Sequence, residues 1–491
     1  MSTRHPPKSI LLTGITGALG SWLAKAAISS GARVCALVRG SATDGRRRAG
    51  QSLCVTGIAS TDLLDTVAGD VLLPGVAAPE HLPQDLDLIV HCAACTEFRD
   101  DASRQTHQTN VDGVRHMLEV ATERRVPFVH VSTAYVAGRR TGRVLENELD
   151  AGQTFNNDYE RTKFEGERLV HEWSRQTGLR AIVLRPSIVA GDWHTGRALR
   201  FNTFYDMMHA LDVIGPASGE RLSIQAEPSA TKNVIPVDYF AEVAWRLIQH
   251  GETGTYHIVH PNPITLGRLR EIFSELFNLQ NVELVRQSEF KRLRLNHAER
   301  ICHRVMSPYR PYMNEPEPEF DTSATNAALA GSGVMAPPID LAWFARLLTY
   351  ARQVNWHGAA QPQPKPSSGG DEVIEYFETF LPNKVGRSLL PDLRRLSARI
   401  GIVMREDCSR HWALDVHEGV LRTISTNGMS TDCRFEIDQR TFLEIVSARM
   451  TPQAAFFERR VELSGDVAVG LKSAAIMAQF FKRFPFNPSR S

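Results

Sequence analysis

The chain has 491 residues, of which 42% are hydrophobic and 23% are charged. These values are ordinary for globular proteins, and the length allows two or three domains with large buried cores. The formal net charge of +1 gives no reason to expect a nucleic-acid partner. Seven scattered cysteines favour a reducing cytoplasm over a disulfide framework. Residues 1–8 lack a hydrophobic signal core, and no apolar run is long enough to cross a bilayer, which leaves only peripheral membrane contact open.

A glycine-rich stretch near the N-terminus predicts a dinucleotide-binding turn. Residues 10–12 are an apolar run typical of a buried strand, and the glycines after it precede a helical pattern. Glycines let the chain turn sharply, so that backbone N–H groups meet a pyrophosphate at the positive end of the helix. A tight turn without a nucleotide is the alternative for this stretch taken alone. We expect the cofactor to contact Thr13, Gly14, Thr16, Gly17, Ala18, Leu19 and Gly20.

The first half of the chain alternates between strand and helix patterns. Such alternation predicts an α/β fold with a Rossmann-type doubly wound parallel sheet, whose ligands bind at the carboxyl ends of the strands. The expected strands are residues 9–12, 33–38, 86–91, 128–132 and 181–184.

The residue after the second predicted strand indicates which nicotinamide cofactor is used. Arg39 stands where an enzyme for the unphosphorylated cofactor would carry Asp or Glu, and an Arg favours the 2′-phosphate of NADPH. Three arginines at residues 46–48 follow closely and also favour NADPH, and a solvated basic loop is the alternative. Asp70 and Val71 are expected near the adenine, although an Asp after a Gly is also a common turn.

Small side chains at residues 92–94 suit a strand end where a cofactor passes close to the backbone, and we expect Ala93 to contact it. Cys92 and Cys95 have the spacing of a metal or redox pair. Because no second Cys/His pair lies nearby in the sequence, no metal site is predicted.

Tyr159 and Lys163 carry the predicted chemistry, because a spacing of four places them on one face of a helix. The pKa of an unperturbed phenol is about 10, and a neighbouring ammonium lowers it by stabilising the phenolate. Ser132 and Thr133 end the preceding strand, where Thr133 can hold the substrate oxygen. A Tyr and a Lys four apart are common on exposed helices, but after a nucleotide loop and a Ser-Thr strand end they indicate acid-base catalysis.

The chain from residue 9 to about residue 351 resembles the extended short-chain dehydrogenase/reductases. Within them it resembles the fatty acyl-CoA reductases and the thioester-reductase domains of carboxylic acid reductases. The motifs that carry the resemblance are residues 13–20, 91–94 with Phe98, 110–113, 131–136, the Tyr159 and Lys163 pair, and 185–189. Residues 234–239, and 308–312 with Phe320 and Asp321, resemble the acyl-reductase branch in particular.

This resemblance implies a role for each matching residue. Tyr159 donates the proton, Lys163 holds the nicotinamide ribose and tunes Tyr159, and Thr133 orients the carbonyl oxygen, with Ser132 as the alternate. Asn110 supports the network of the site. The implied cofactor contacts further along the chain are Asn110, Tyr159, Lys163, Pro186 and Ile188.

A mixed substrate lobe over residues 198–351 is expected to complete a reductase domain of residues 1–355. Aromatic and methionine residues near its start either line an acyl channel or, as their spacing favours, pack in a core: Phe201, Phe204, Tyr205, Met207 and Met208. Residues 356–370, rich in Pro, Ser and Gly, predict an extended linker.

Residues 371–491 predict a separate α+β domain that resembles the sterol carrier protein 2 family of lipid-binding domains. The matching stretches are residues 435–437, 442–446, 451–456 and, most specifically, 461–466. In that family a sheet and helices enclose an apolar tunnel for acyl chains or sterols. The side chains along the last helix that would face a tunnel, or equally a packed core, are Leu471, Ala475, Ala478 and Phe481.

Together these patterns predict a cytoplasmic, NADPH-dependent reductase of a hydrophobic acyl thioester, carried by CoA or an acyl carrier protein, with a tethered lipid-binding domain. The product is an aldehyde or, if reduction continues, an alcohol. A 3-hydroxysteroid-type or ketone reductase is one alternative, with the same catalytic residues but no thiol leaving group. A lipid-transfer protein with a redox-sensing nucleotide domain is another, and the intact Tyr159 and Lys163 pair argues against it.

Overall fold

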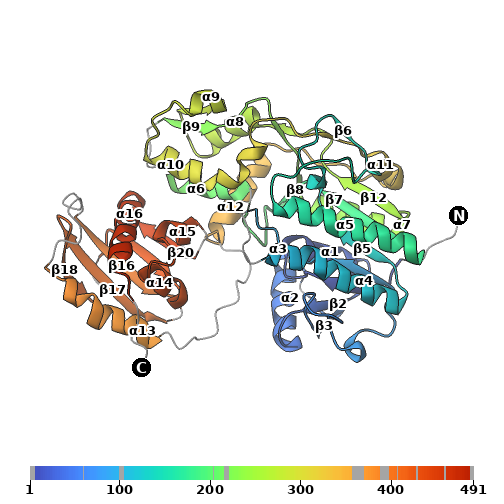
Figure 1. Ribbon diagram of the computed structural model, residues 1–491, viewed down its shortest axis with the longest axis horizontal. Helices are drawn as coiled ribbons and strands as arrows, with labels where there is room; N and C mark the ends of the chain where they lie inside the picture. The colour runs from blue at the N-terminus through green and yellow to red at the C-terminus, as the bar shows by residue number, and fades with distance from the viewer. Residues whose placement is uncertain are drawn as a thin grey trace. The chain divides into compact units, whose positions relative to one another are not determined.

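The computed structural model describes residues 6–58, 60–98, 104–202, 204–214, 221–356, 370–386, 397–405, 407–426, 430–457 and 460–486. The chain divides into two compact units, Met1–Gln361 and Pro362–Ser491 (Figure 1). Nearly all of the predicted linker, residues 356–370, lies outside the described residues.

A seven-stranded parallel sheet forms the centre of the first unit. Its strands lie in the order β12-β7-β5-β4-β1-β2-β3, and all neighbours are parallel. The order reverses between β1 and β4, at the switch point where ligands of doubly wound sheets bind. All five predicted strands are present, and β3 and β12 are additional to them. The bounds are β1 (Ser9–Thr13), β2 (Arg33–Val38), β3 (Leu64–Ala68), β4 (Leu88–His91), β5 (Phe128–Val131), β7 (Ala181–Pro186) and β12 (Gly254–Ile258).

Helices cover both faces of this sheet (Figure 1). Their bounds are α1 (Ala18–Ser29), α2 (Ala42–Thr56), α4 (Gly113–Arg124), α5 (Asp158–Thr177) and α7 (Val237–His250). Helices α1, α2 and α7 share one core with Ile10 and Leu12 of β1, whereas α4 and α5 share the opposite core with Leu11. Successive residues of one strand are therefore buried on both faces, which confirms the predicted Rossmann-type α/β fold.

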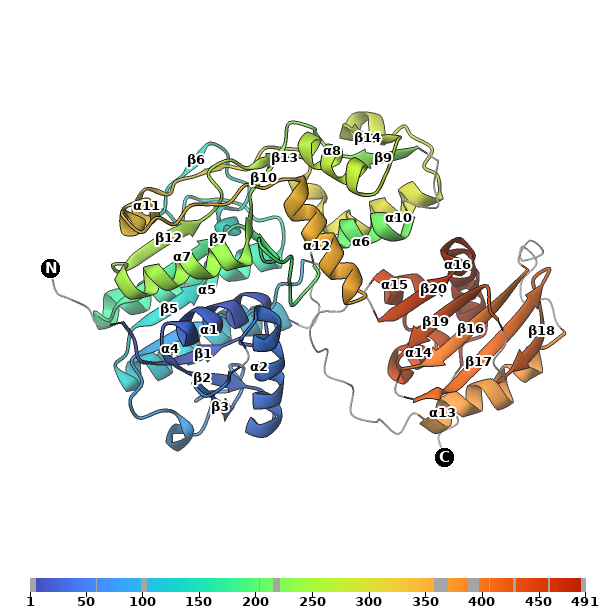
Figure 2. The same ribbon diagram turned by 180° about the vertical axis from the view of Figure 1, so that it is seen from behind.

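The lobe of the first unit has a hydrophobic core of its own. The predicted stretch, residues 198–351, is interrupted, because β11 (Val234–Pro236), α7 and β12 return the chain to the sheet unit. Figure 2 shows α6, α8, α10 and α12 gathered in this lobe. Its main elements are α6 (Phe204–Ile214), β9 (Leu222–Gln225), β10 (Thr231–Lys232), β13 (Ile264–Thr265), α8 (Leu266–Leu276), β14 (Val282–Val285), α9 (Gln287–Phe290), α10 (His297–Val305) and α12 (Leu341–Gln353).

Shorter elements connect the sheet unit and the lobe. They are α3 (Gln105–His107), β6 (Arg143–Val144), β8 (Ile188–Ala190), β15 (Glu319–Phe320) and α11 (Ser323–Leu329). Strand β8 pairs with β11 and β6 pairs with β15, so segments far apart in the sequence are joined beside the main sheet.

The second unit contains a five-stranded mixed sheet in the order β18-β17-β16-β19-β20, in which only the β16–β19 pair is parallel. One core joins this sheet to its helices. Among the described residues of the whole chain, no helix is both long and apolar enough to span a membrane. The bounds are α13 (Gly370–Glu375), β16 (Ala398–Met404), β17 (Asp407–His417), β18 (Val420–Ser425), β19 (Cys433–Ile437), α14 (Gln439–Val446), α15 (Pro452–Phe457), β20 (Val461–Gly465) and α16 (Val467–Arg483).

The buried side of α16 differs from the predicted one. Of the four residues expected to face a tunnel or core, only Phe481 is buried; Leu471, Ala475 and Ala478 are partly exposed. Gly470 sets this rotation, because a Cβ there would lie 2.5 Å from the Leu463 side chain of β20. The buried residues of the helix are Gly470, Ser473, Ala474, Phe480 and Phe481.

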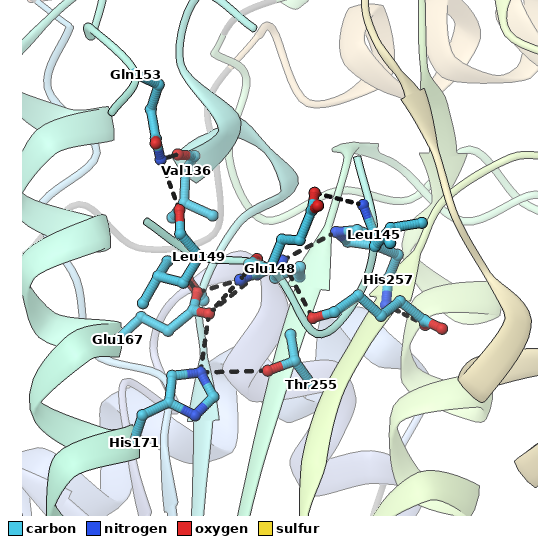
Figure 3. A network of polar contacts seen from close by, with 12 residues as sticks. Val136, Leu145, Glu148, Leu149, Gln153, Glu167, His171, Thr255 and His257 are labelled. Atoms are coloured by element: carbon cyan, nitrogen blue, oxygen red, sulfur yellow. Dashed lines mark hydrogen bonds and ion pairs between the residues drawn. The ribbon is translucent and has the colours of Figure 1, made fainter. Parts of the chain in front are cut away.

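A buried ion pair attaches α5 to the sheet of the first unit. The Arg185 guanidinium, on β7, donates to the Glu167 carboxylate, on α5, with an Nη2–Oε1 distance of 2.6 Å. The two side chains are 1% and 0% exposed. Arg185 also donates to the Glu148 carbonyl at 2.8 Å, which holds the loop after β6 (Figure 3). Burial alone would raise the pKa of Glu167, but Arg185 and His171 lower it to about 2.

We expect Arg185→Met to destabilise the first unit by about 3–5 kcal/mol, because it leaves the Glu167 carboxylate buried without its partner. In calorimetry, the unfolding transition of the first unit is the one whose midpoint temperature rises when NADPH is added. The change in this transition measures the loss of stability. The double variant Glu167→Gln/Arg185→Met is expected to recover part of it. Equal losses in the single and double variants would contradict the assignment.

Acid should remove the same stabilisation. An unfolded Glu titrates near pH 4.3, and the folded Glu167 has a pKa of about 2. A carboxylate whose pKa is lowered by folding stabilises the fold above the unfolded pKa and loses that effect as the pH falls towards the folded pKa. We therefore expect the stability difference between wild type and Glu167→Gln to close between about pH 4.3 and 2, as measured by unfolding transitions across that range.

Candidate active site

The turn after β1 allows a ligand to approach the backbone closely. Gly14 has a φ of +78°, and a Cβ there would lie 2.7 Å from the Ala93 nitrogen. The Thr13 hydroxyl oxygen accepts the N–H groups of Cys92 and Ala93 at 3.1 and 3.0 Å, which ties the ends of β1 and β4 together. Gly20 packs against this turn, because a Cβ there would lie 2.2 Å from the Gly14 oxygen.

The start of α1 fits the pyrophosphate of a dinucleotide. Gly17 is its N-cap and carries no side chain to cap the helix, and no acidic residue stands in the first turn. The first N–H groups of the helix are thus left for an anion at the positive end of the helix dipole. Thr16 lies in the turn before this helix and Ala18 and Leu19 are its first residues, so the predicted cofactor loop is one continuous stretch.

Arg39, Asp70 and Val71 lie just beyond β2 and β3. Arg39 is exposed directly after β2. The pKa of Arg200 is lowered mainly by its own burial and further by the positive charge of Arg39, so the two guanidinium groups lie near each other. Asp70 Oδ1 accepts the Leu72 N–H at 3.0 Å, which is the turn that the sequence offered as the alternative. Val71 is buried. Contact of Asp70 and Val71 with the adenine stays a prediction.

The three predicted catalytic side chains come together at the end of β5. Tyr159 and Lys163 both lie on α5, and Thr133 follows β5 directly. The Thr133 hydroxyl lies close enough to the Tyr159 phenol to lower its pKa, and it donates to the Pro186 carbonyl oxygen at 3.5 Å. Pro186, expected near the nicotinamide, therefore borders the same site.

The protonation of Tyr159 differs from the expectation. Burial raises the pKa of Tyr159 to about 12, and the Thr133 hydrogen bond offsets only part of that rise. Lys163 Nζ donates to the Val131 carbonyl of β5 at 2.6 Å, and burial lowers its pKa to about 8. Lys163 is not among the groups that shift the phenol pKa, so the expected lowering by this ammonium is absent and burial of the phenol dominates. The phenol is therefore protonated at neutral pH.

Asn110 and Ser132 hold the site together from within the protein. Asn110 lies in a π-helical turn, η2 (Gln108–Asp112), a feature common at functional sites. Its Oδ1 accepts the Cys95 N–H at 2.8 Å and its Nδ2 donates to Thr162 Oγ1 of α5 at 3.0 Å, in agreement with the expected supporting role. The Ser132 hydroxyl donates to Glu167 at 2.7 Å, which favours Thr133 over Ser132 as the residue that holds the substrate.

An apolar cavity lies beside Tyr159, with a volume of about 960 Å³ that includes its opening to solvent. The Phe98 ring in its wall lies 5.2 Å from the Tyr159 ring. Ile188, a predicted cofactor contact, lines it as well. Phe204 and Met207 also line the cavity, and Phe201, Tyr205, Met207 and Met208 belong to the lobe core, so Met207 fits both interpretations of that stretch.

Sequence reasoning missed several residues of the cavity wall. Tyr309 and Tyr312 come from a 3₁₀ segment, η5 (Ser307–Tyr312), so the motif at residues 308–312 was the signal that could have found them. The Tyr312 hydroxyl donates to Glu160 of α5 at 2.5 Å. Lys232 and Glu317 pair across 85 residues of sequence, and no local pattern connects them.

Two families match separate parts of the chain. The male sterility protein family, an NAD-binding family, matches residues 12–244, and the SCP-2 sterol transfer family matches residues 377–478.

Three curated relatives match about half of the chain. Glycine betaine reductase ATRR of Emericella nidulans is 27% identical over 297 residues, which cover 55% of this chain and 22% of the relative. The carboxylic acid reductase of Mycobacterium tuberculosis is 25% identical over 293 residues, covering 53% and 25%. The probable fatty acyl-CoA reductase 4 of Arabidopsis thaliana is 22% identical over 283 residues, covering 45% and 55%. The chain thus spans about a quarter of the length of the first two and about half of the third.

Solved structures share the fold of the first unit. The terminal R domain from the myxalamid PKS-NRPS biosynthetic pathway is 24% identical with a TM-score of 0.62, covering 73% of this chain and 93% of that domain. A thiolation-reductase di-domain from an archaeal non-ribosomal peptide synthetase is 18% identical with a TM-score of 0.58, covering 72% and 77%. The chain therefore carries an NAD-binding domain of the male sterility protein family, followed by a domain of the SCP-2 sterol transfer family.

Proposed function

We propose that this protein is an NADPH-dependent reductase of a hydrophobic acyl thioester, carried by CoA or by an acyl carrier protein, with a tethered lipid-binding domain. The observation that carries this proposal is the Thr133 and Tyr159 pair beside an apolar cavity of about 960 Å³. The carboxylic acid reductase and fatty acyl-CoA reductase among the relatives support a reductase, and the SCP-2 family match supports a lipid ligand.

Each side chain has a part in the proposed reaction. When bound, the nicotinamide cofactor would supply a hydride to the thioester carbonyl carbon. Thr133 and Tyr159 hold the carbonyl oxygen, and the Tyr159 phenol, protonated at neutral pH, gives that oxygen its proton. The resulting hemithioacetal loses the thiol and leaves the aldehyde, so one hydride and one proton are consumed for each thiol released. Lys163 holds the nicotinamide ribose beside Tyr159.

The leaving group distinguishes this reaction from its main alternative. Purified protein is incubated with NADPH and an acyl-CoA, an acyl-carrier-protein thioester or a steroid ketone, and products are identified by mass spectrometry. Release of free thiol together with aldehyde or alcohol supports the proposal. Reduction of the ketone alone, without thiol release, would favour the ketone reductase.

Tyr159→Phe should remove the proton donor and lower turnover by a factor of about 10²–10⁴, with NADPH affinity nearly unchanged. Lys163→Ala should weaken both turnover and NADPH binding. Steady-state kinetics and fluorescence titration with NADPH measure the two effects. Tyr256→Phe is the matched control, because Tyr256 lies on the edge strand β12. Its hydroxyl donates to the Glu252 carbonyl. Near wild-type turnover in Tyr159→Phe would exclude this mechanism.

Arg39→Asp should weaken NADPH binding about ten- to a hundredfold and NADH binding far less, because it replaces a phosphate partner with a repelling charge. Dissociation constants for both cofactors test this. Arg47→Asp makes the same change of charge on α2, where Arg47 pairs with Asp44 at 2.7 Å, and should not alter cofactor preference. A wild-type enzyme that already prefers NADH would refute the assignment.

The protein truncated after Ala360 should fold and reduce short, soluble acyl thioesters at nearly the full-length rate. Its efficiency should fall as the acyl chain of the substrate lengthens. A flexible tether holds a second domain at a local concentration on the order of millimolar. Each buried CH₂ contributes about 0.8 kcal/mol, so capture by that domain should favour longer chains. Rates across a series of acyl-CoA lengths provide the measurement.

The isolated piece from Asp371 onward provides the complementary test, and it should bind a fluorescent fatty-acyl probe. An isolated piece that binds no lipid would reject the proposed role of the second domain. So would a truncation that lowers activity equally on short and long chains, since that result indicates a structural role.

A further inference from the structure

One buried ion pair interrupts the mostly apolar wall of the cavity. Glu317 Oε1 accepts the Tyr135 hydroxyl at 2.6 Å and the Lys232 ammonium at 3.2 Å, and Oε2 accepts the Asn233 N–H at 2.6 Å. The side chains of Lys232 and Glu317 are only 6% and 7% exposed. Burial of two charges costs desolvation free energy that apolar side chains of similar size would avoid. The pair therefore stabilises the wall of an acyl channel less than apolar side chains of similar size would.

The partners of Glu317 keep hydrogen-bonding capacity on the side of the cavity. An ammonium has three donors, and among the described residues Lys232 Nζ donates to Glu317 and to the Thr231 carbonyl, the latter at 2.6 Å. The Tyr135 hydroxyl donates its one hydrogen to Glu317, so its oxygen can still accept a hydrogen bond. Tyr135 and Lys232 both line the cavity. Together they offer one charged donor and one acceptor.

The position of this cluster relates it to the reacting carbonyl. Tyr135 follows Thr133 by two residues, and its N–H donates to the Thr133 hydroxyl oxygen at 3.3 Å. The Tyr135 ring lies 5.8 Å from the Tyr312 ring, which in turn lies 6.2 Å from the Phe98 ring that packs on Tyr159. The cluster thus lines the cavity that an acyl chain leaving a carbonyl held by Thr133 would enter.

A hydroxyl group complements this pair of side chains, because it accepts one hydrogen bond and donates another. We propose that Tyr135 and Lys232 bind a hydroxyl group near the thioester end of the acyl chain, so that hydroxyacyl thioesters are the preferred substrates. This inference rests on the proposed function and names its substrate class.

Substrate pairs of equal length test the inference in the full-length protein. The kcat/KM for 3-hydroxydecanoyl-CoA and for 5-hydroxydecanoyl-CoA is compared with that for decanoyl-CoA, with NADPH present. We expect at least one hydroxyacyl substrate to be preferred roughly tenfold, as for one hydrogen-bonded hydroxyl with a charged partner. Tyr135→Phe should reduce this preference to about twofold or less. This variant leaves Lys232 and Glu317 paired, so it preserves the charge balance of the wall.

Tyr309→Phe is the matched control. It removes a phenol from the same wall, but that hydroxyl donates to Asp206 at 2.7 Å and not to the cluster. It should change the rates for all three substrates together and leave their ratio intact.

A structural role for the ion pair makes a different prediction. The Glu317 N–H also donates to Thr231 Oγ1 at 3.2 Å, so the pair could serve only to hold this segment of backbone. Tyr135→Phe would then lower all three rates equally, and that result would overturn the inference. Reduction of decanoyl-CoA without any preference for a hydroxyl would overturn it too, while the proposed function would stand. If none of the three acyl chains is reduced, either as the CoA thioester or as the acyl-carrier-protein thioester, both proposals fail.

Discussion

The site depends on a charge pair that is buried completely. The Glu167 and Arg185 side chains meet at 2.6 Å between α5 and β7, and a helix held in this way cannot slide or rotate without exposing an unpaired charge to a low dielectric. Lys163 and Tyr159 lie one and two turns earlier on the same helix. Their positions beside Thr133 are therefore set by a contact that takes no part in the chemistry. The Ser132 hydroxyl is engaged by the same carboxylate, which leaves Thr133 as the hydroxyl at the site.

Helix α5 also connects the sheet of the first unit to its lobe. Its Glu160 accepts the Tyr312 hydroxyl from η5, a segment of the lobe, while Glu167 holds it to the sheet. Helix α5 thus links Tyr159 and Lys163 to the lobe that forms much of the cavity wall. A change of residue in η5 can therefore alter Tyr159 through α5 as well as the cavity wall. This coupling is the physical reason to read rates and substrate preferences together in variants of this region.

The two units have separate hydrophobic cores, and this supports a separate function for each unit. The first unit contains the glycine turn after β1, the Thr133, Tyr159 and Lys163 side chains and the cavity, whereas the second has its own mixed sheet and helices. Because neither core shares residues with the other, each unit can bury its apolar surface by itself. A lipid-binding role for the second unit would then require only that it stay tethered.

Local features were determined by the sequence. The parallel strands, the glycine turn after β1 and the placement of Tyr159 and Lys163 on one helical face follow from periodicity and spacing, which act between near neighbours in the chain. Tertiary contacts decided the rest. Burial raises the pKa of Tyr159, Leu463 rotates the buried side of α16, and Lys232 meets Glu317 across 85 residues. Each of these depends on atoms that approach only after the chain has folded, and no local pattern carries that information.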